Sequence, residues 1–269
     1  MIYLLNFFNK KNISIVLSFT LLGIVISIYK GYGDDLDSYA MIKTFIRIIK
    51  EGYYLPSRFY GYPFGELFYG FLAFHFGSFI SSFLSYIMFL SSLLLIIKCY
   101  SKNLIFDNKN LIFVLLCFSN PVLFLDNTNP SDAPLSLFLF SLGFFLYKKK
   151  LLIYAGIFFA LTIATRANYG LFVYTIILYD VFLKKRIDLK IFELLVLCTL
   201  ITFLFYYPAF ILNKFDISFI TNPGGPEIQF MSLLPRFFYK TFLSYGIYSS
   251  ILIFLIYILN FNYINKRIS

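Results

Sequence analysis

The feature that most constrains this chain is a series of long apolar runs separated by short polar segments. Several approach or reach the roughly 20 residues that a helix needs to cross a bilayer. The candidate spans are residues 13–29, 79–97, 110–125, 133–147, 151–165, 168–183, 191–212 and 241–262. The sequence therefore predicts an all-α fold, a polytopic transmembrane bundle of about eight spans that forms a single transmembrane domain over residues 1–269.

Composition and cysteine placement agree with a membrane protein. The chain is 60% hydrophobic and only 13% charged, whereas soluble domains carry about 25% charged residues. Cys99, Cys117 and Cys198 lie in or beside apolar runs without metal-type or disulfide-type spacing. Lys10 and Lys11 precede the first apolar run, but no small-residue cleavage site follows it, so we expect an uncleaved first span.

The basic residues predict an orientation in the membrane. With the N-terminus in the cytoplasm, every predicted inner turn has a basic cluster, and the external segments hold equal numbers of acids and bases. The net charge of +10 then falls on the cytoplasmic side, as the positive-inside rule requires. We therefore expect a multi-pass protein of the cell (inner) membrane with both termini in the cytoplasm. The same distribution argues against a nucleic-acid partner.

The first external loop, residues 30–78, begins with three carboxylates, Asp34, Asp35 and Asp37. Carboxylates at a membrane surface are costly unless they are solvated, paired or bound to a cation. One interpretation is an N-cap and acidic first turn for an amphipathic interfacial helix over residues 40–51. The other is a general base, or a ligand for a divalent cation such as Mg²⁺ or Mn²⁺, beside a lipid-borne substrate.

The rest of this loop is rich in helix breakers. Arg58 stands among tyrosines, where it can anchor at lipid headgroups or bind a phosphate through its two-pronged guanidinium. Residues 64–78 are apolar but interrupted by glycines, which predicts a re-entrant or interfacial helix rather than a full crossing.

Three shorter external segments hold the remaining polar candidates. Asp132 follows Ser131 before an apolar run, as N-cap residues do. Arg166 has almost no loop around it, so it needs a partner or a ligand. The last external loop, residues 213–240, is rich in turn residues and carries Arg236 and Lys240.

Together these motifs resemble the GT-C superfamily of integral membrane glycosyltransferases. The resemblance is to the polyprenyl-phosphate-sugar dependent group that includes protein O-mannosyltransferases and lipid A aminoarabinose transferases. Asp34-Asp35 follows the first span, Gly61-Tyr62-Pro63 lies in the same loop, and residues 129–135 and 156–170 are similar to the family's middle region. The family usually has more spans, and many members have a soluble external domain at the C-terminus.

The resemblance implies inverting transfer of a sugar from a polyprenyl-phosphate donor to a glycan, lipid or protein acceptor on the external (periplasmic) side. Asp34 or Asp35 would deprotonate the acceptor or help to hold a cation. The departing lipid phosphate would be stabilised by Arg58, Arg166, Arg236 and Lys240, with Asp37, Tyr62, Asp132 and Asn168 in support.

Three other functions stay open. A transporter or flippase for lipid-linked saccharides would carry ionisable residues in mid-membrane and often shows repeated halves, whereas here the charges lie at the span ends. A polysaccharide polymerase or ligase would also use external arginines, but the acidic motif after the first span favours the GT-C interpretation. A non-catalytic assembly subunit fits the short C-terminus.

Overall fold

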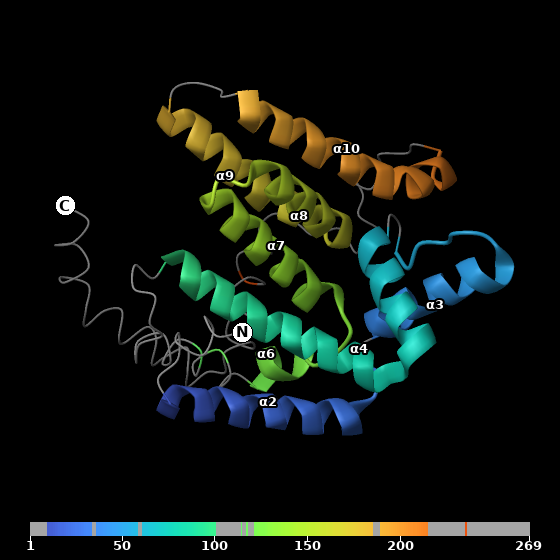
Figure 1. The fold of residues 1–269 in the computed structure, drawn as a ribbon. Coiled ribbons are helices and arrows are strands. Elements are labelled where there is room, and N and C mark those ends of the chain that lie inside the picture. The colour runs from blue at the N-terminus through green and yellow to red at the C-terminus, as the bar shows by residue number, and fades with distance from the viewer. Residues whose placement is uncertain are drawn as a thin grey trace. The chain divides into compact units, whose positions relative to one another are not determined.

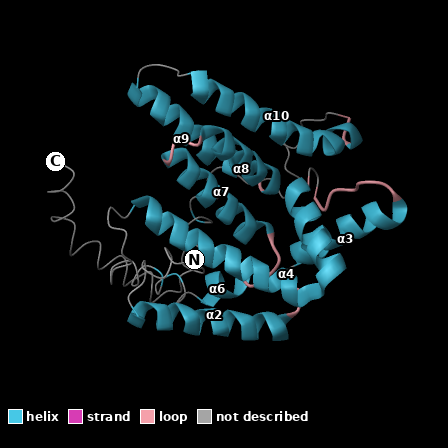
Figure 2. Cartoon of the chain, in the orientation of Figure 1, coloured by secondary structure: helices cyan, strands magenta, loops and turns pink. Residues whose placement is uncertain are grey.

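The computed structural model describes residues 10–33, 36–58, 61–100, 114, 117, 121–184, 189–214 and 235. Over these residues the regular structure is helical, without strands (Figure 2). The helices are α2 (Lys10–Lys30), α3 (Leu36–Glu51), α4 (Pro63–Tyr100), α6 (Pro121–Asp126), α7 (Asp132–Lys148), α8 (Leu152–Thr165), α9 (Tyr169–Lys184) and α10 (Leu189–Leu212). The all-α prediction is confirmed for this part of the chain.

The chain divides into two compact units. The first comprises Met1–Val114 and Asp126–Asp216, and it contains every functional candidate whose side chain is described. The second comprises Leu115–Leu125 and Ile217–Ser269, of which the structure describes residues 117, 121–125 and 235.

In the first unit, helices α4, α7 and α8 pack side by side (Figure 1). Helices α2 and α3 contact α4, while α9 and α10 contact α8. Small residues allow close approach: a Cβ at Gly156 of α8 would lie 3.3 Å from the backbone oxygen of Leu194 in α10. Such contacts are typical of helices that associate within lipid.

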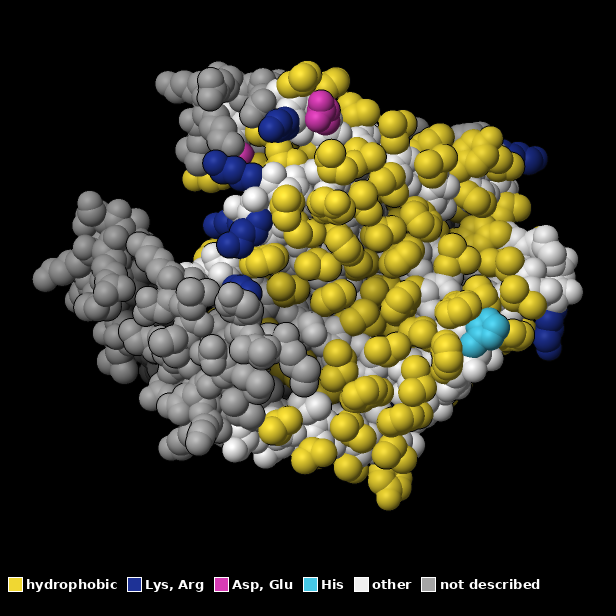
Figure 3. All heavy atoms as spheres, viewed as in Figure 1, with side chains coloured by type: hydrophobic (Ala, Val, Ile, Leu, Met, Phe, Trp, Pro, Cys, Tyr) yellow, Lys and Arg dark blue, Asp and Glu magenta, His cyan; other side chains and the backbone are white. Residues whose placement is uncertain are grey.

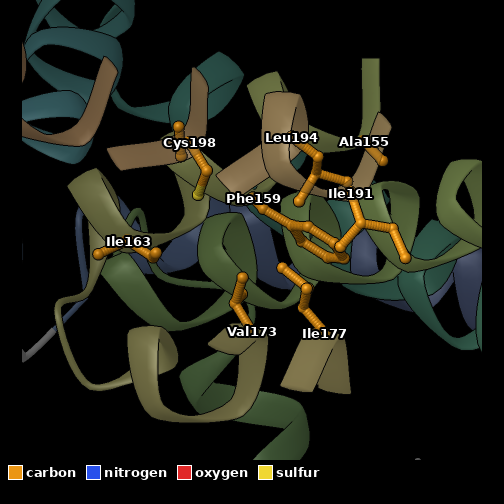
Figure 4. Close-up of a cluster of buried hydrophobic side chains, with 9 residues drawn as sticks. Ala155, Phe159, Ile163, Val173, Ile177, Ile191, Leu194 and Cys198 are labelled. Atoms are coloured by element: carbon orange, nitrogen blue, oxygen red, sulfur yellow. The ribbon is translucent and has the colours of Figure 1, made fainter. Parts of the chain in front are cut away.

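Two clusters of buried apolar side chains fix this arrangement. One lies between α8, α9 and α10 (Figure 4) and consists of Ala155, Phe159, Ala160, Ile163, Val173, Ile177, Ile191, Leu194 and Cys198. The other joins α3, α4 and α7 and consists of Met41, Tyr69, Leu72, Met88, Leu135 and Leu139. Through Met41, Tyr69 and Leu135, the second cluster joins the first turns of these three helices, which adjoin several of the polar candidates.

Helix α4 contains a break at Gly77, whose φ of 77° and ψ of −172° are not helical. The positive φ favours glycine, because a side chain would be strained there. The break separates the predicted interfacial stretch 64–78 from the predicted span 79–97. The boundary between them is confirmed, and re-entry of the first part into the membrane stays a prediction.

Two helices, Pro63–Tyr100 and Leu189–Leu212, are long and apolar enough to cross a membrane, and shorter apolar helices cover Leu17–Lys30, Leu152–Thr165 and Tyr169–Phe182. Large apolar side chains are exposed on these elements, including Leu171 and Phe182 of α9 and Leu204 of α10. Hydrophobic side chains cover the middle of one face, with basic side chains near its edges (Figure 3). Most of the predicted span at 110–125 and all of that at 241–262 lie outside the described residues, so the eight-span topology stays a prediction.

Candidate functional site

The turn before α3 lies against the loop that precedes α7. Gly33 has a φ of +79°, and its N–H donates to the carbonyl oxygen of Lys30 at 3.0 Å. A Cβ at Gly33 would overlap the side chain of Asn129. Asp34 and Asp35 follow immediately, and their side chains lie outside the described residues. The turn at Gly33 therefore packs against the 127–131 loop.

Helix α3 confirms the predicted amphipathic helix and fixes the position of Asp37. Its buried side, with Met41 and Phe45, packs on α4. Phe45 fits against Gly70, where a Cβ would overlap the phenylalanine side chain. This close packing places Asp37, in the first turn of α3, near the start of α4.

The segment between α3 and α4 is organised by the carboxyl group of Glu66, which is fully buried. Its Oε2 accepts a hydrogen bond from the Tyr54 hydroxyl at 2.6 Å. Its Oε1 accepts from the backbone N–H groups of Ser57 at 2.8 Å and Tyr62 at 3.1 Å, and also from the Ser57 hydroxyl. A single carboxyl group thus holds both ends of the segment that presents Arg58.

Arg58 makes the first of two ion pairs. Its guanidinium is paired with the carboxylate of Asp37 and lies over the ring of Tyr62, 5.2 Å from the ring centroid. The side chains of Arg58 and Asp37 are 53% and 33% exposed. The arginine is therefore held in place by two partners and still faces solvent.

Arg166 makes the second ion pair. Its Nε lies 3.3 Å from Oδ2 of Asp132, the first residue of α7. Asp132 is nearly buried, with its side chain 10% exposed, while that of Arg166 is 40% exposed. The expectation that Arg166 has a partner is confirmed. Ser131 occupies the N-cap position of α7, but its side chain makes no capping hydrogen bond.

The two ion pairs are electrostatically coupled. Burial raises the pKa of Asp132 above its ordinary value, and both Arg166 and Arg58 act in the opposite direction. Burial also raises the pKa of Tyr62, which Asp132 raises further while Arg58 lowers it. The two ion pairs therefore influence each other, although their residues come from α3, the 52–62 segment, α7 and the turn after α8. We call Asp37, Arg58, Tyr62, Asp132 and Arg166 the charged cluster.

Several buried polar atoms on the same segments have no hydrogen-bond partner: the hydroxyl of Ser38, Oδ1 of Asn129 and Oδ2 of Asp132. Oδ2 of Asp132 is within ion-pair distance of Arg166, yet the geometry is not that of a hydrogen bond. Buried polar atoms without partners are costly, so they indicate groups that a ligand or water completes.

The structure thus brings together five of the predicted site residues, those of the charged cluster. Asn168 is exposed beside the Arg166 turn and belongs to neither ion pair. Asp34, Asp35, Arg236 and Lys240 lie outside the described residues. Glu66 and Asn129 were not predicted as site residues. The only signal for Glu66 in the sequence is an acid placed inside an otherwise apolar run.

Metal binding by Asp34 and Asp35 is not addressed by the described residues. Among those residues, no group of three or more His, Cys, Asp or Glu side chains could hold a metal ion. The cysteines Cys99, Cys117 and Cys198 are free thiols, and Cys198 is buried in the α8–α10 cluster.

Comparisons with protein-family models, curated proteins and solved structures give no match for this chain.

Proposed function

We propose that this chain is a membrane glycosyltransferase that moves a sugar from a polyprenyl-phosphate donor to an acceptor on the non-cytoplasmic side of the membrane. The observation that carries the proposal is the charged cluster, in which two half-exposed arginines are each anchored to a carboxylate. The cluster lies where α3, α4 and α7 begin. This position suits a donor whose lipid tail stays in the bilayer.

The arginines supply the chemistry that a departing phosphate requires. A guanidinium has five donors and binds phosphate oxygens through two parallel hydrogen bonds. Arg166 contacts Asp132 through Nε, and its side chain is 40% exposed, so it is open to a second anion. Because Asp37 and Asp132 already orient the two guanidinium groups, little reorganisation is needed when negative charge develops on the leaving phosphate.

Asp34 or Asp35 would activate the acceptor hydroxyl as the general base, or would help to hold a divalent cation. The assignment is supported by their described neighbours in the sequence: Gly33 packs against Asn129, and Leu36 begins α3. The carboxylates of the cluster itself are ion-paired with arginines, which suits them less well to proton transfer.

The test is transfer of radiolabel from a polyprenyl-phosphate sugar by the purified chain in lipid vesicles. We expect Arg58→Ala and Arg166→Ala each to lower the transfer rate by about 100-fold or more, the usual cost of removing one group that stabilises transition-state charge. Arg47→Ala is the matched control, because Arg47 lies on α3 outside the cluster.

The acidic pair is tested in the same assay. Asp34→Asn and Asp35→Asn variants that both retain full activity would rule out the catalytic assignment. A wild-type chain that moves the labelled lipid across the vesicle membrane without transferring sugar would favour a flippase. A chain that does neither, yet binds the donor, would favour a non-catalytic assembly subunit.

A further inference from the structure

A second polar surface lies at the opposite ends of α4 and α7. It consists of Lys98 near the end of α4, Lys148 at the end of α7, and Lys149 and Lys150 in the turn that follows. All four lysines are exposed. We call these lysines, with Tyr100, Phe144 and Phe145, the lysine–aromatic surface.

Three of the four lysines lie over aromatic rings. The Nζ of Lys148 lies 5.5 Å from the ring centroid of Tyr100 and 5.3 Å from that of Phe144. Phe145 is contacted by two ammonium groups, with Lys98 at 5.5 Å and Lys149 at 5.8 Å. Two like charges on one ring repel each other, so this arrangement favours an anion bound between them.

The positive charge is not neutralised within the described part of the chain. Its ion pairs are those of Arg58 and Arg166, and none involves these four lysines. The carboxylate of Asp180 accepts a hydrogen bond from the Tyr147 hydroxyl at 2.8 Å, and one acid offsets only part of the charge of four lysines. The C-terminal ends of the α4 and α7 dipoles favour nearby cations, yet four lysines exceed what two helix ends require.

The backbone adds a second argument. Lys150 has a φ of +62° at the position after the C-cap of α7, where glycine is usual. A lysine at this position accepts backbone strain of about 1 kcal/mol. The turn nevertheless closes normally, since the N–H of Leu151 donates to the carbonyl oxygen of Leu146 at 3.0 Å. The strained position thus carries a charge where glycine would be more stable.

We infer that the lysine–aromatic surface binds the headgroups of anionic phospholipids. The lysines lie at the ends of apolar helices, and three of them lie over aromatic rings, a combination expected at the level of lipid phosphates. Lipid binding here goes beyond the orientation signal that a basic turn provides, and it does not depend on the proposed sugar transfer.

The test measures the Kd of the purified full chain, in neutral detergent micelles, for short-chain phosphatidylglycerol and for phosphatidylcholine of the same acyl length. We expect the wild type to prefer phosphatidylglycerol at least fivefold at low salt. Each lysine near an anionic headgroup contributes about fivefold, so Lys148→Gln/Lys149→Gln should lower the preference by up to about 25-fold, and adding Lys98→Gln and Lys150→Gln should abolish it. Lys148→Arg/Lys149→Arg should keep it. The matched control is Lys43→Gln/Lys50→Gln, which removes two exposed lysines from α3.

Other outcomes would overturn the inference. It fails if the wild type binds both lipids equally, if the double Gln variant keeps the full preference, or if the α3 control loses as much. It also fails if millimolar inorganic phosphate displaces the lipid, because the site would then fit a soluble anion. If the Gln variant does not fold, the wild type alone decides, since 1 M NaCl should remove most of the preference by screening.

Discussion

Removing the side chain of Glu66 should release the segment that carries Arg58. In Glu66→Ala, the Tyr54 hydroxyl, the Ser57 hydroxyl and the N–H groups of Ser57 and Tyr62 all lose their acceptor. At about 1 kcal/mol of net stabilisation for each hydrogen bond, the closed segment should lose about 4 kcal/mol. Glu66→Gln should cost far less, because its amide keeps one oxygen for the Ser57 and Tyr62 donors, and the Tyr54 hydroxyl can accept from the new NH₂ group.

The assay is limited trypsin cleavage after Arg58 in the purified protein, with Glu193→Ala on α10 as the control for loss of an exposed acid. When the Arg58 segment opens and closes faster than trypsin cleaves it, the cleavage rate follows the fraction of molecules in which the segment is open. A loss of 4 kcal/mol therefore predicts cleavage roughly 100-fold to 1,000-fold faster in Glu66→Ala, against less than tenfold in Glu66→Gln. Equal cleavage rates in wild type and Glu66→Ala would refute the assigned role of Glu66.

Three further predictions follow from packing and charge. Gly70→Ala should destabilise the fold by about 1–3 kcal/mol, as overpacking does, because its Cβ would overlap Phe45; thermal unfolding measures this, and an unchanged Tm would contradict it. Gly33→Ala should lower both Tm and transfer rate, since it adds strain at φ +79° and displaces Asn129; full activity would mean that this turn does not position the acidic pair. Burial raises the pKa of Asp132 above its ordinary 3.8, so its contribution to stability is complete below that pH and is lost as pH rises through the folded-state value. Unfolding measured against pH should therefore show a decline that Asp132→Asn lacks, and identical profiles would contradict it.

The sequence predicted the elements better than their contacts. Apolar periodicity predicted α3, and the ends of the apolar runs predicted the boundaries of α7 to α10 closely. Both signals are local, because they depend on which residues of one element are buried. The interruption at Gly77 was also predicted, since glycines within an apolar run weaken the helix and favour a break there.

Contacts between distant segments could not be derived in this way. Nothing local to Asp132 indicates that Arg166 is its partner, because their meeting depends on how α7 packs against α8. Pairing of Arg58 with Asp37 likewise depends on the hydrogen bonds of Glu66, which fold the intervening segment back. The sequence left Arg58 open between a headgroup anchor and a phosphate ligand.

The central claim is that Arg58 and Arg166 belong to one phosphate-binding cluster. Its most direct test is the Kd for polyprenyl phosphate in the wild type, Arg58→Ala, Arg166→Ala, the double variant and Arg47→Ala. Each single variant should bind polyprenyl phosphate about tenfold or more weakly, a loss typical of hydrogen bonds to charged groups. Because both arginines act on Asp132, the double variant should depart from additivity by at least about 0.5 kcal/mol. Arg47→Ala should bind as the wild type does. Unchanged binding in both single variants, or strictly additive losses, would contradict the claim.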